Sequence, residues 1–183
     1  ALDQNLSEAL ERDAATGALQ RRFFIERLKQ ALSQPIKAGI RQLISIEADK
    51  LAVICEDLGP LAVEDFVAQF AGLIDETRQP NDLFGRFGDG AFMVLMERGT
   101  VRDVEIWAKN LIKKVGAQVF RVGDKQISCT CSIGIGAIDP RSPDVPKTMR
   151  RRVAAALLPV AAGPVGDALH RRLMAGGMYG DVR

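Results

Sequence analysis

A Gly-Asp-Gly sequence between two apolar runs is the part of this chain best suited to chemistry. Residues 84–97 read FGRFGDGAFMVLME, with Gly88, Asp89 and Gly90 at the centre. Asp-Gly predicts a tight hairpin turn, because glycine accepts the positive φ of such a turn and aspartate tolerates the neighbouring position. Small residues at a tip let a phosphate group approach the backbone closely, and a carboxylate there can bind a cation. We therefore predict a β-hairpin with a chemically special tip.

The elements around this hairpin follow from apolar periodicity and from turn residues. Helices are predicted over 2–11, over a segment carrying Leu19, Phe23, Leu28 and Leu32, over 49–56, from Gly59 and Pro60 to Pro80, over 101–115 with Trp107 at its margin, and near 148–158. Strands are predicted over 40–46 and in a second hairpin, in which 118–122 and 127–138 flank Gly123 and Asp124. This order predicts an α+β fold, with a mostly antiparallel central sheet flanked by helices.

The last predicted strand has one apolar face and one face of small residues. Ile127, Cys129, Cys131, Ile133 and Ile135 alternate with serine, threonine and glycine. We interpret the apolar face as core, which makes the two cysteines small hydrophobic residues and not metal or redox groups. The small-residue face fits either solvent exposure or the close approach of another element or a ligand. Both interpretations remain open at this point.

Size and composition are those of an ordinary globular domain. The chain has 183 residues, 47% hydrophobic and 26% charged, and its formal net charge of +2 is too small to indicate nucleic-acid binding. Its three cysteines lack metal-binding spacing, and their odd number argues against a disulfide framework. The longest apolar run, residues 153–165, is interrupted by proline and glycine and is too short to span a membrane. With no signal peptide at its start, we expect a cytoplasmic protein.

From Asp13 onward the chain resembles the GGDEF domains of diguanylate cyclases in five motifs that occur in the family's order. The motifs are Asp13, Thr16 and Gly17 with residues 21–23; Glu47, Ala48 and Asp49 with Gly59; the signature at Gly88, Asp89, Gly90, Ala91 and Phe92; residues 132–135; and Ala168, Leu169 and His170 with Gly176 and Gly177. The resemblance implies a nucleotidyl cyclase-like fold with a ferredoxin-like core. It also implies chemistry that joins two GTP molecules with the help of a divalent metal.

The signature keeps the frame of that family and loses its acids. Gly90 and Ala91 stand where the family has acidic residues, and neither offers a side-chain oxygen to a metal. The first carboxylate of the family is present as Glu47, and Asp49 follows it. Asp89 could replace the carboxylate missing at position 90 only through a register shift of the turn. The resemblance therefore implies a vestigial metal site, with no cofactor unless residual nucleotide binding brings Mg²⁺.

The positions that bind the nucleotide in the family also carry different residues in this chain. Cys55 stands where the family has an asparagine that reads guanine, and Glu64 stands at the partnering aspartate. Ala52 and Leu173 replace lysines that neutralise phosphate in the family. Arg86 is retained, and a strand-edge role would also explain it.

The family's product-feedback site, Arg-x-x-Asp, falls on residues 79–82. Asp82 is kept, whereas Arg78 is one residue out of frame. The resemblance therefore implies a vestigial inhibitory site here.

Together these losses favour a catalytically inactive GGDEF domain over residues 13–183, which serves as a regulatory or scaffolding module in bacterial cyclic diguanylate signalling. The pattern resembles GGDEF-EAL regulators of the FimX kind, which act in type IV pilus regulation. That resemblance implies an adjoining EAL or sensory domain in a longer protein, protein partners of the pathway, and a homodimer as one assembly. Residues 1–12 are then either a linker helix or a solvated leader.

Three alternatives remain. One is a sensor that binds GTP without turning it over, and another is a weakly active cyclase that uses Glu47, Asp49 and Asp89 for metal. The third is a fold that now serves protein contacts alone.

Overall fold

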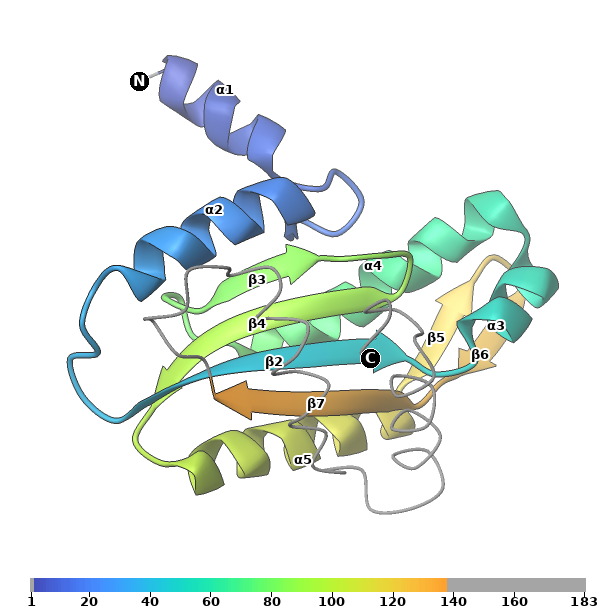
Figure 1. Cartoon of the computed structure of the whole chain (residues 1–183). Coiled ribbons are helices and arrows are strands. Elements are labelled where there is room, and N and C mark those ends of the chain that lie inside the picture. Colours follow the sequence, from blue (N-terminus) through green and yellow to red (C-terminus); the bar gives the residue numbers. More distant parts are fainter. Residues whose placement is uncertain (1, 138–183) are drawn as a thin grey trace, which may run out of the picture.

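The computed structural model describes residues 2–137, which form a five-stranded sheet with helices on both faces (Figure 1). The strands, in spatial order, are β1 (Leu19–Gln20), β3 (Leu83–Arg86), β4 (Ala91–Arg98), β2 (Ile40–Ala48) and β7 (Cys131–Ala137). All neighbouring strands are antiparallel except β1 and β3. The prediction of an α+β fold with a mostly antiparallel central sheet is therefore confirmed.

Five helices and a separate strand pair complete the described part of the chain. The helices are α1 (Leu2–Glu11), α2 (Arg21–Leu32), α3 (Leu51–Leu58), α4 (Pro60–Thr77) and α5 (Val101–Ala117), and the pair is β5 (Val119–Val122) with β6 (Lys125–Ser128). The helix expected near 148–158 lies outside the described residues, as do Leu173 and the motif from Ala168 to Gly177.

Two hydrophobic layers cover the sheet, because alternate residues of a strand point to opposite faces. Ile46 of β2 and Phe92 of β4 belong to the larger layer, under α4 and α5. Leu43 and Met93 belong to the smaller layer, under α2. The central strand β2 is consequently buried on both faces, and its pairing with β4 and β7 fixes its register on both sides.

Local signals set the ends of the helices that cover the larger layer. Gly59, with a φ of 82°, makes the sharp joint between α3 and α4, and Pro60 then starts α4 at a position where proline is well tolerated. Thr100 and Asp103 form a capping box at the start of α5. Trp107 lies at the margin of the core, as predicted, and its Nε1–H donates to the carbonyl of Thr77 over 3.1 Å.

Two predicted boundaries were wrong in the first third of the chain. Leu19 is not in a helix, because it pairs with Gly85 as part of β1, and α2 begins only at Arg21. Phe24, rather than Phe23, is the fully buried aromatic residue of that helix. The helix expected from residue 49 begins at Leu51, because the preceding residue, Lys50, has a left-handed φ of 52°.

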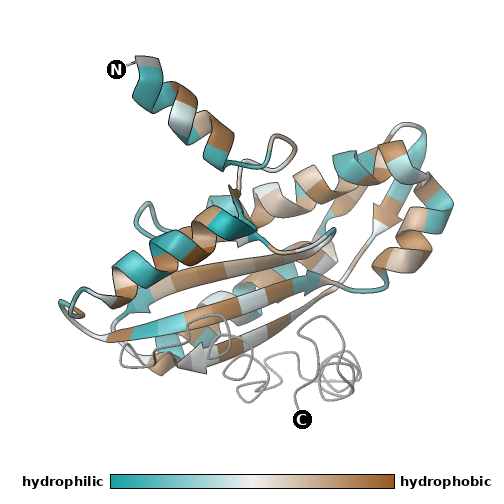
Figure 2. Cartoon of the chain, turned by 45° about the horizontal axis from the view of Figure 1, so that its top comes forward, coloured by the Kyte–Doolittle hydropathy of each residue, from teal (hydrophilic) through white to brown (hydrophobic). Residues whose placement is uncertain are grey.

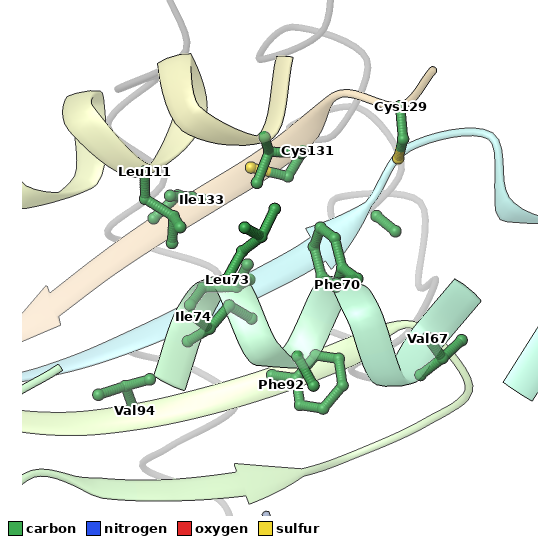
Figure 3. Close-up of a cluster of buried hydrophobic side chains, with 14 of the residues drawn as sticks. Val67, Phe70, Leu73, Ile74, Phe92, Val94, Leu111, Cys129, Cys131 and Ile133 are labelled. Atoms are coloured by element: carbon green, nitrogen blue, oxygen red, sulfur yellow. The ribbon is translucent and has the colours of Figure 1, made fainter. Parts of the chain in front are cut away.

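The long strand predicted over 127–138 was also wrong, because it is two strands. The chain leaves the β5–β6 pair after Ser128 and joins the central sheet as β7 at Cys131. The apolar side is core as expected, and Figure 3 shows Cys129 and Cys131 within the cluster of buried hydrophobic side chains. Burial raises the pKa of the Cys129 thiol to about 11 and also raises the pKa of Cys131, which fits two unreactive core residues. On the face of small residues, Ser132 is buried, so solvent exposure does not explain the small residue at that position.

Helix α1 extends away from the sheet (Figure 2). Its C-terminal end is held to the domain by a salt bridge of 2.6 Å between Glu11 and Arg27 and by a hydrogen bond from Gln20 to the carbonyl of Leu10. No helix within residues 2–137 has the length and apolar character needed to cross a bilayer.

Candidate functional site

The predicted hairpin is present, formed by β3 and β4 with its tip at residues 87–90. Arg86 is in register with Phe92, and the amide of Phe87 donates to the carbonyl of Ala91 over 2.8 Å. The expected reason for its glycines was wrong, because neither Gly88 nor Gly90 has the positive φ that we expected of this turn.

Gly90 lies close to side chains at the end of β2 and the start of α3. A Cβ atom on Gly90 would lie 2.9 Å from Cδ2 of Leu51 and 3.3 Å from Cβ of Ala48. A Cβ on Gly88 would meet only the Cβ of Ala91, at an ordinary 3.5 Å. The third signature position is therefore crowded by the start of α3, whereas the first is open.

The sheet register decides which signature residue lies beside Glu47. Glu47 pairs with Ala91, and the amide of Ala48 donates to the carbonyl of Gly90 over 2.9 Å. Glu47 is buried, whereas Asp89 is exposed at the tip. The register shift that would bring Asp89 into the place of the lost carboxylate is thus not present.

The carboxylate of Asp49 is engaged by the start of β7. Its two oxygens accept hydrogen bonds of 2.6 Å from Thr130 Oγ1 and 2.7 Å from Ser132 Oγ. Its backbone amide also donates to the carbonyl of Thr130. This residue therefore anchors β7 to the end of β2.

The residues present do not fit the divalent metal of the family. Gly90 and Ala91 carry no oxygen beside Glu47, and Asp49 is occupied by two hydroxyl groups. Over residues 2–137, no three His, Cys, Asp or Glu side chains come together as a group that could hold a metal ion. A hard cation requires several such oxygen ligands.

Arg86 is the centre of an ionic network that fixes the tip. Its guanidinium donates to Glu64 over 2.9 and 3.1 Å and to Asp13 over 3.1 Å. It also donates to the carbonyl groups of Gly88 and Asp89, each over 3.0 Å. With its side chain only 13% exposed, Arg86 joins the turn to α4 and to the loop after α1. A simple strand-edge role does not describe this residue.

The same contacts change the protonation of the two acids. The hydrogen bond from Arg86 is the largest influence on the Glu64 carboxyl and holds its pKa below the ordinary value. Burial acts to raise the pKa of Asp13, but hydrogen bonds from Thr16 and Arg86 outweigh it, and the net pKa is lowered. Both carboxylates are consequently charged partners of Arg86 at neutral pH.

Glu64 and Cys55 occupy the two positions expected to read guanine. Glu64 is bound to Arg86. Cys55 is partly buried on α3, and burial together with the charge of Asp89 raises the pKa of its thiol. A neutral thiol beside a carboxylate is a weak hydrogen-bonding group for a base edge.

Asp82 lies at the other end of the hairpin, away from the tip. Its carboxylate receives two hydrogen bonds from Arg98, of 2.9 and 2.7 Å, and one of 2.8 Å from the amide of Gln79. Arg78 binds the backbone carbonyl of Asp82 and forms its salt bridge with Asp75. The feedback-site acid is thus engaged within the fold.

Sequence reasoning missed two contributors to the site. Asp13 was matched as a motif residue, with no prediction of its contact with Arg86, which lies 73 residues further along the chain. Leu51 carried no signal at all, because an apolar residue at the start of a helix is unremarkable before its contact with Gly90 is known.

Comparison with known proteins identifies the class to which this fold and site belong. The sequence matches the family described as "Diguanylate cyclase, GGDEF domain" over residues 10–160. The chain therefore belongs to the GGDEF family.

Among its curated relatives is diguanylate cyclase DgcP of Pseudomonas aeruginosa, which is 27% identical over 128 residues. That match covers 69% of this chain and 19% of DgcP. The chain spans about a fifth of the length of the curated relatives it matches.

Two solved structures from Pseudomonas aeruginosa show the same fold. The FimX GGDEF domain superposes with a TM-score of 0.72 at 24% identity, covering 84% of this chain and 95% of that one. Diguanylate cyclase SiaD, solved in complex with its activator SiaC, superposes with a TM-score of 0.74 at 24% identity, covering 87% of this chain and 61% of that one. At these identities the likeness establishes the fold.

Proposed function

We propose that this GGDEF domain is catalytically inactive and acts as a regulatory or scaffolding module in cyclic diguanylate signalling. The observation that carries the proposal is the register of β2 with β4, which puts Gly90 and Ala91 beside Glu47. Phosphoryl transfer depends almost entirely on positioning and on charge stabilisation by metal and cations. A site with one carboxylate at this point lacks the second ligand that a bridging metal needs.

The charges around the tip support the same proposal. Ala52 stands at the position of an expected phosphate-neutralising lysine, and Arg86 is already bound to two carboxylates and two carbonyl groups. Asp89 is exposed at the tip and adds negative charge. Lys50 is exposed just before α3 and keeps one positive charge near the tip, so a nucleoside triphosphate would meet less positive charge than with a lysine at position 52 as well.

We also propose that the domain, over residues 13–183, works within a longer cytoplasmic protein. The chain covers about a fifth of its curated relatives, which leaves room for an EAL or sensory domain beside it. A complex of SiaD with an activator protein supports partners that act through this fold. Helix α1 then serves as the linker, and a homodimer is one assembly in which it would act.

Incubation of the chain with GTP and Mg²⁺ or Mn²⁺, followed by chromatography for cyclic diguanylate, tests the proposal. We expect no product, with DgcP assayed in parallel as the positive control. Turnover that is abolished by Glu47→Ala would show instead that the domain is a weak cyclase.

A GTP-binding sensor is the second candidate, and the open space at Gly88 favours it. The tip offers room for a phosphate near the exposed residues Gly88 and Asp89. Calorimetric titration with GTP decides this candidate, because a sensor gives saturable heat without product. No heat at millimolar nucleotide removes it.

A further inference from the structure

We propose that the corner between α3 and α4 is a docking surface for a basic amphipathic helix of a partner protein. The inference rests on the proposed function, since it names the chemistry of the partner that a regulatory module would bind. It is carried by two exposed apolar side chains and by the charges that surround them.

The apolar anchors are Leu61 and Val53. Leu61, at the start of α4, is 89% exposed, and Val53, on α3, is 54% exposed. The two helices meet at Gly59, and Val53 lies about 9 Å along α3 from that joint at the usual helical rise. Both anchors are therefore within reach of about two turns of one partner helix.

The surroundings of these anchors are acidic. Residues 51–77 contain no lysine or arginine and six acids, Glu56, Asp57, Glu64, Asp65, Asp75 and Glu76. Three of them are neutralised within the fold, through salt bridges to Arg86, Arg78 and Lys114.

The other three acids are those nearest the anchors. Glu56, Asp57 and Asp65 are exposed and form no salt bridge within the described residues. Two lysines lie near them: Lys125, whose ammonium binds the backbone carbonyl of Asp57, and exposed Lys50, whose carbonyl accepts from the amide of Val53. Three acids against two lysines leave the surroundings of the anchors net negative.

This combination selects a basic partner over the other ligands available to the fold. The negative charge repels nucleotides and anionic lipid, whereas lysine and arginine on a partner gain attraction at the rim. Leucine-like side chains on the same partner can cover Leu61 and Val53, which act as the central anchors of such an interface. An amphipathic helix presents both kinds of residue at i, i+3, i+4 and i+7.

The test is a titration of the isotope-labelled chain with a defined peptide, followed by amide chemical shifts. The probe is a helical peptide of about 18 residues with leucine on one face and lysine on the other. A matched peptide carries glutamate in place of lysine. We expect the lysine peptide to shift amides concentrated in residues 51–65, with weaker binding as ionic strength rises.

Variants separate the docking surface from non-specific attraction. Leu61→Ser should weaken the lysine peptide about tenfold, and Glu56→Gln combined with Asp65→Asn should weaken it and flatten the salt dependence. Ile106→Ser, on α5, is the matched control, because Ile106 is also exposed, at 47%. These are surface substitutions, so the fold is retained.

Equal affinity of the parent and Leu61→Ser chains, or shifts centred outside residues 51–65, would overturn the docking surface. Equal binding of the glutamate peptide would do the same. Formation of cyclic diguanylate by the chain, in contrast, would contradict the proposed function and leave the peptide result standing.

Discussion

Arg86 shows how one side chain sets the geometry of the hairpin tip. Its four partners come from three places: Asp13 after α1, Glu64 on α4, and the carbonyl groups of Gly88 and Asp89 in the turn. Hydrogen bonds between charged groups are stronger than neutral ones and are costly to leave unmade. The retained arginine of the signature is therefore a structural centre in this chain.

Replacing Arg86 with methionine tests this role. We expect Arg86→Met to lower the free energy of unfolding at neutral pH by about 2 kcal/mol, because two partly buried carboxylates lose their donor. Urea unfolding measures the change. Arg121→Met is the control, because Arg121 is exposed on β5.

The pH dependence of the same variants follows from the lowered pKa values of Asp13 and Glu64. Because the folded protein binds fewer protons than the unfolded chain near these values, stability rises with pH there. The contribution is complete above the ordinary values of 3.8 and 4.5 and is lost as the pH falls through the lower folded values. Arg86→Met should flatten this acid limb, and parallel curves for parent and variant would contradict the network.

At the scale of elements, close packing between α2 and β3 holds the hairpin in place. Gly85 of β3 lies against Phe24, which is fully buried in the smaller core. A Cβ atom on Gly85 would lie 2.6 to 2.8 Å from the ring and from Cβ of Phe24. Since the Cβ of Phe24 cannot move with a change of rotamer, the helix itself would have to shift.

We therefore expect Gly85→Ala to destabilise the protein by about 2 kcal/mol, as overpacking does in other cores. Thermal or urea unfolding measures it. Gly116→Ala is the matched substitution on α5, where a Cβ meets nothing within 4 Å, and it should stabilise by about 0.5–1 kcal/mol through helix propensity. A neutral Gly85→Ala would show that α2 is mobile against the sheet.

At the scale of the whole molecule, the elements differ in strand pairing and in burial. Strand β2 is paired on both sides and buried on both faces, whereas β5 and β6 pair only with each other among residues 2–137. Helix α1 extends from the body, and its residues 3–10 are exposed (Figure 2). Stability should therefore rise from α1 through the β5–β6 pair to the central strands.

Hydrogen exchange of backbone amides measures this order directly. We expect α1 to exchange first, the β5–β6 pair next, and β2 last, because the pair packs on α4 but has short strands, whereas β2 is paired along both edges. Protection of β5 and β6 equal to that of β2 would mean that the pair opens only with the whole domain.

Several features of the fold and site could be predicted from the sequence because their signals are local. Gly59 and Pro60 marked the start of α4, and the Gly-Asp-Gly sequence between two apolar runs marked the hairpin. The loss of acids at Gly90 and Ala91 could also be read directly, since it is a matter of residue type.

The sequence by itself determined the family, the main elements and the absence of side-chain oxygens at Gly90 and Ala91. Only the tertiary structure decided that Gly90 lies against Leu51, that Arg86 bonds to Asp13 and Glu64, and that the predicted strand over 127–138 divides after Ser128. The physical reason is distance along the chain. Periodicity and turn chemistry act between near neighbours, whereas these contacts join residues that only the folded sheet brings together.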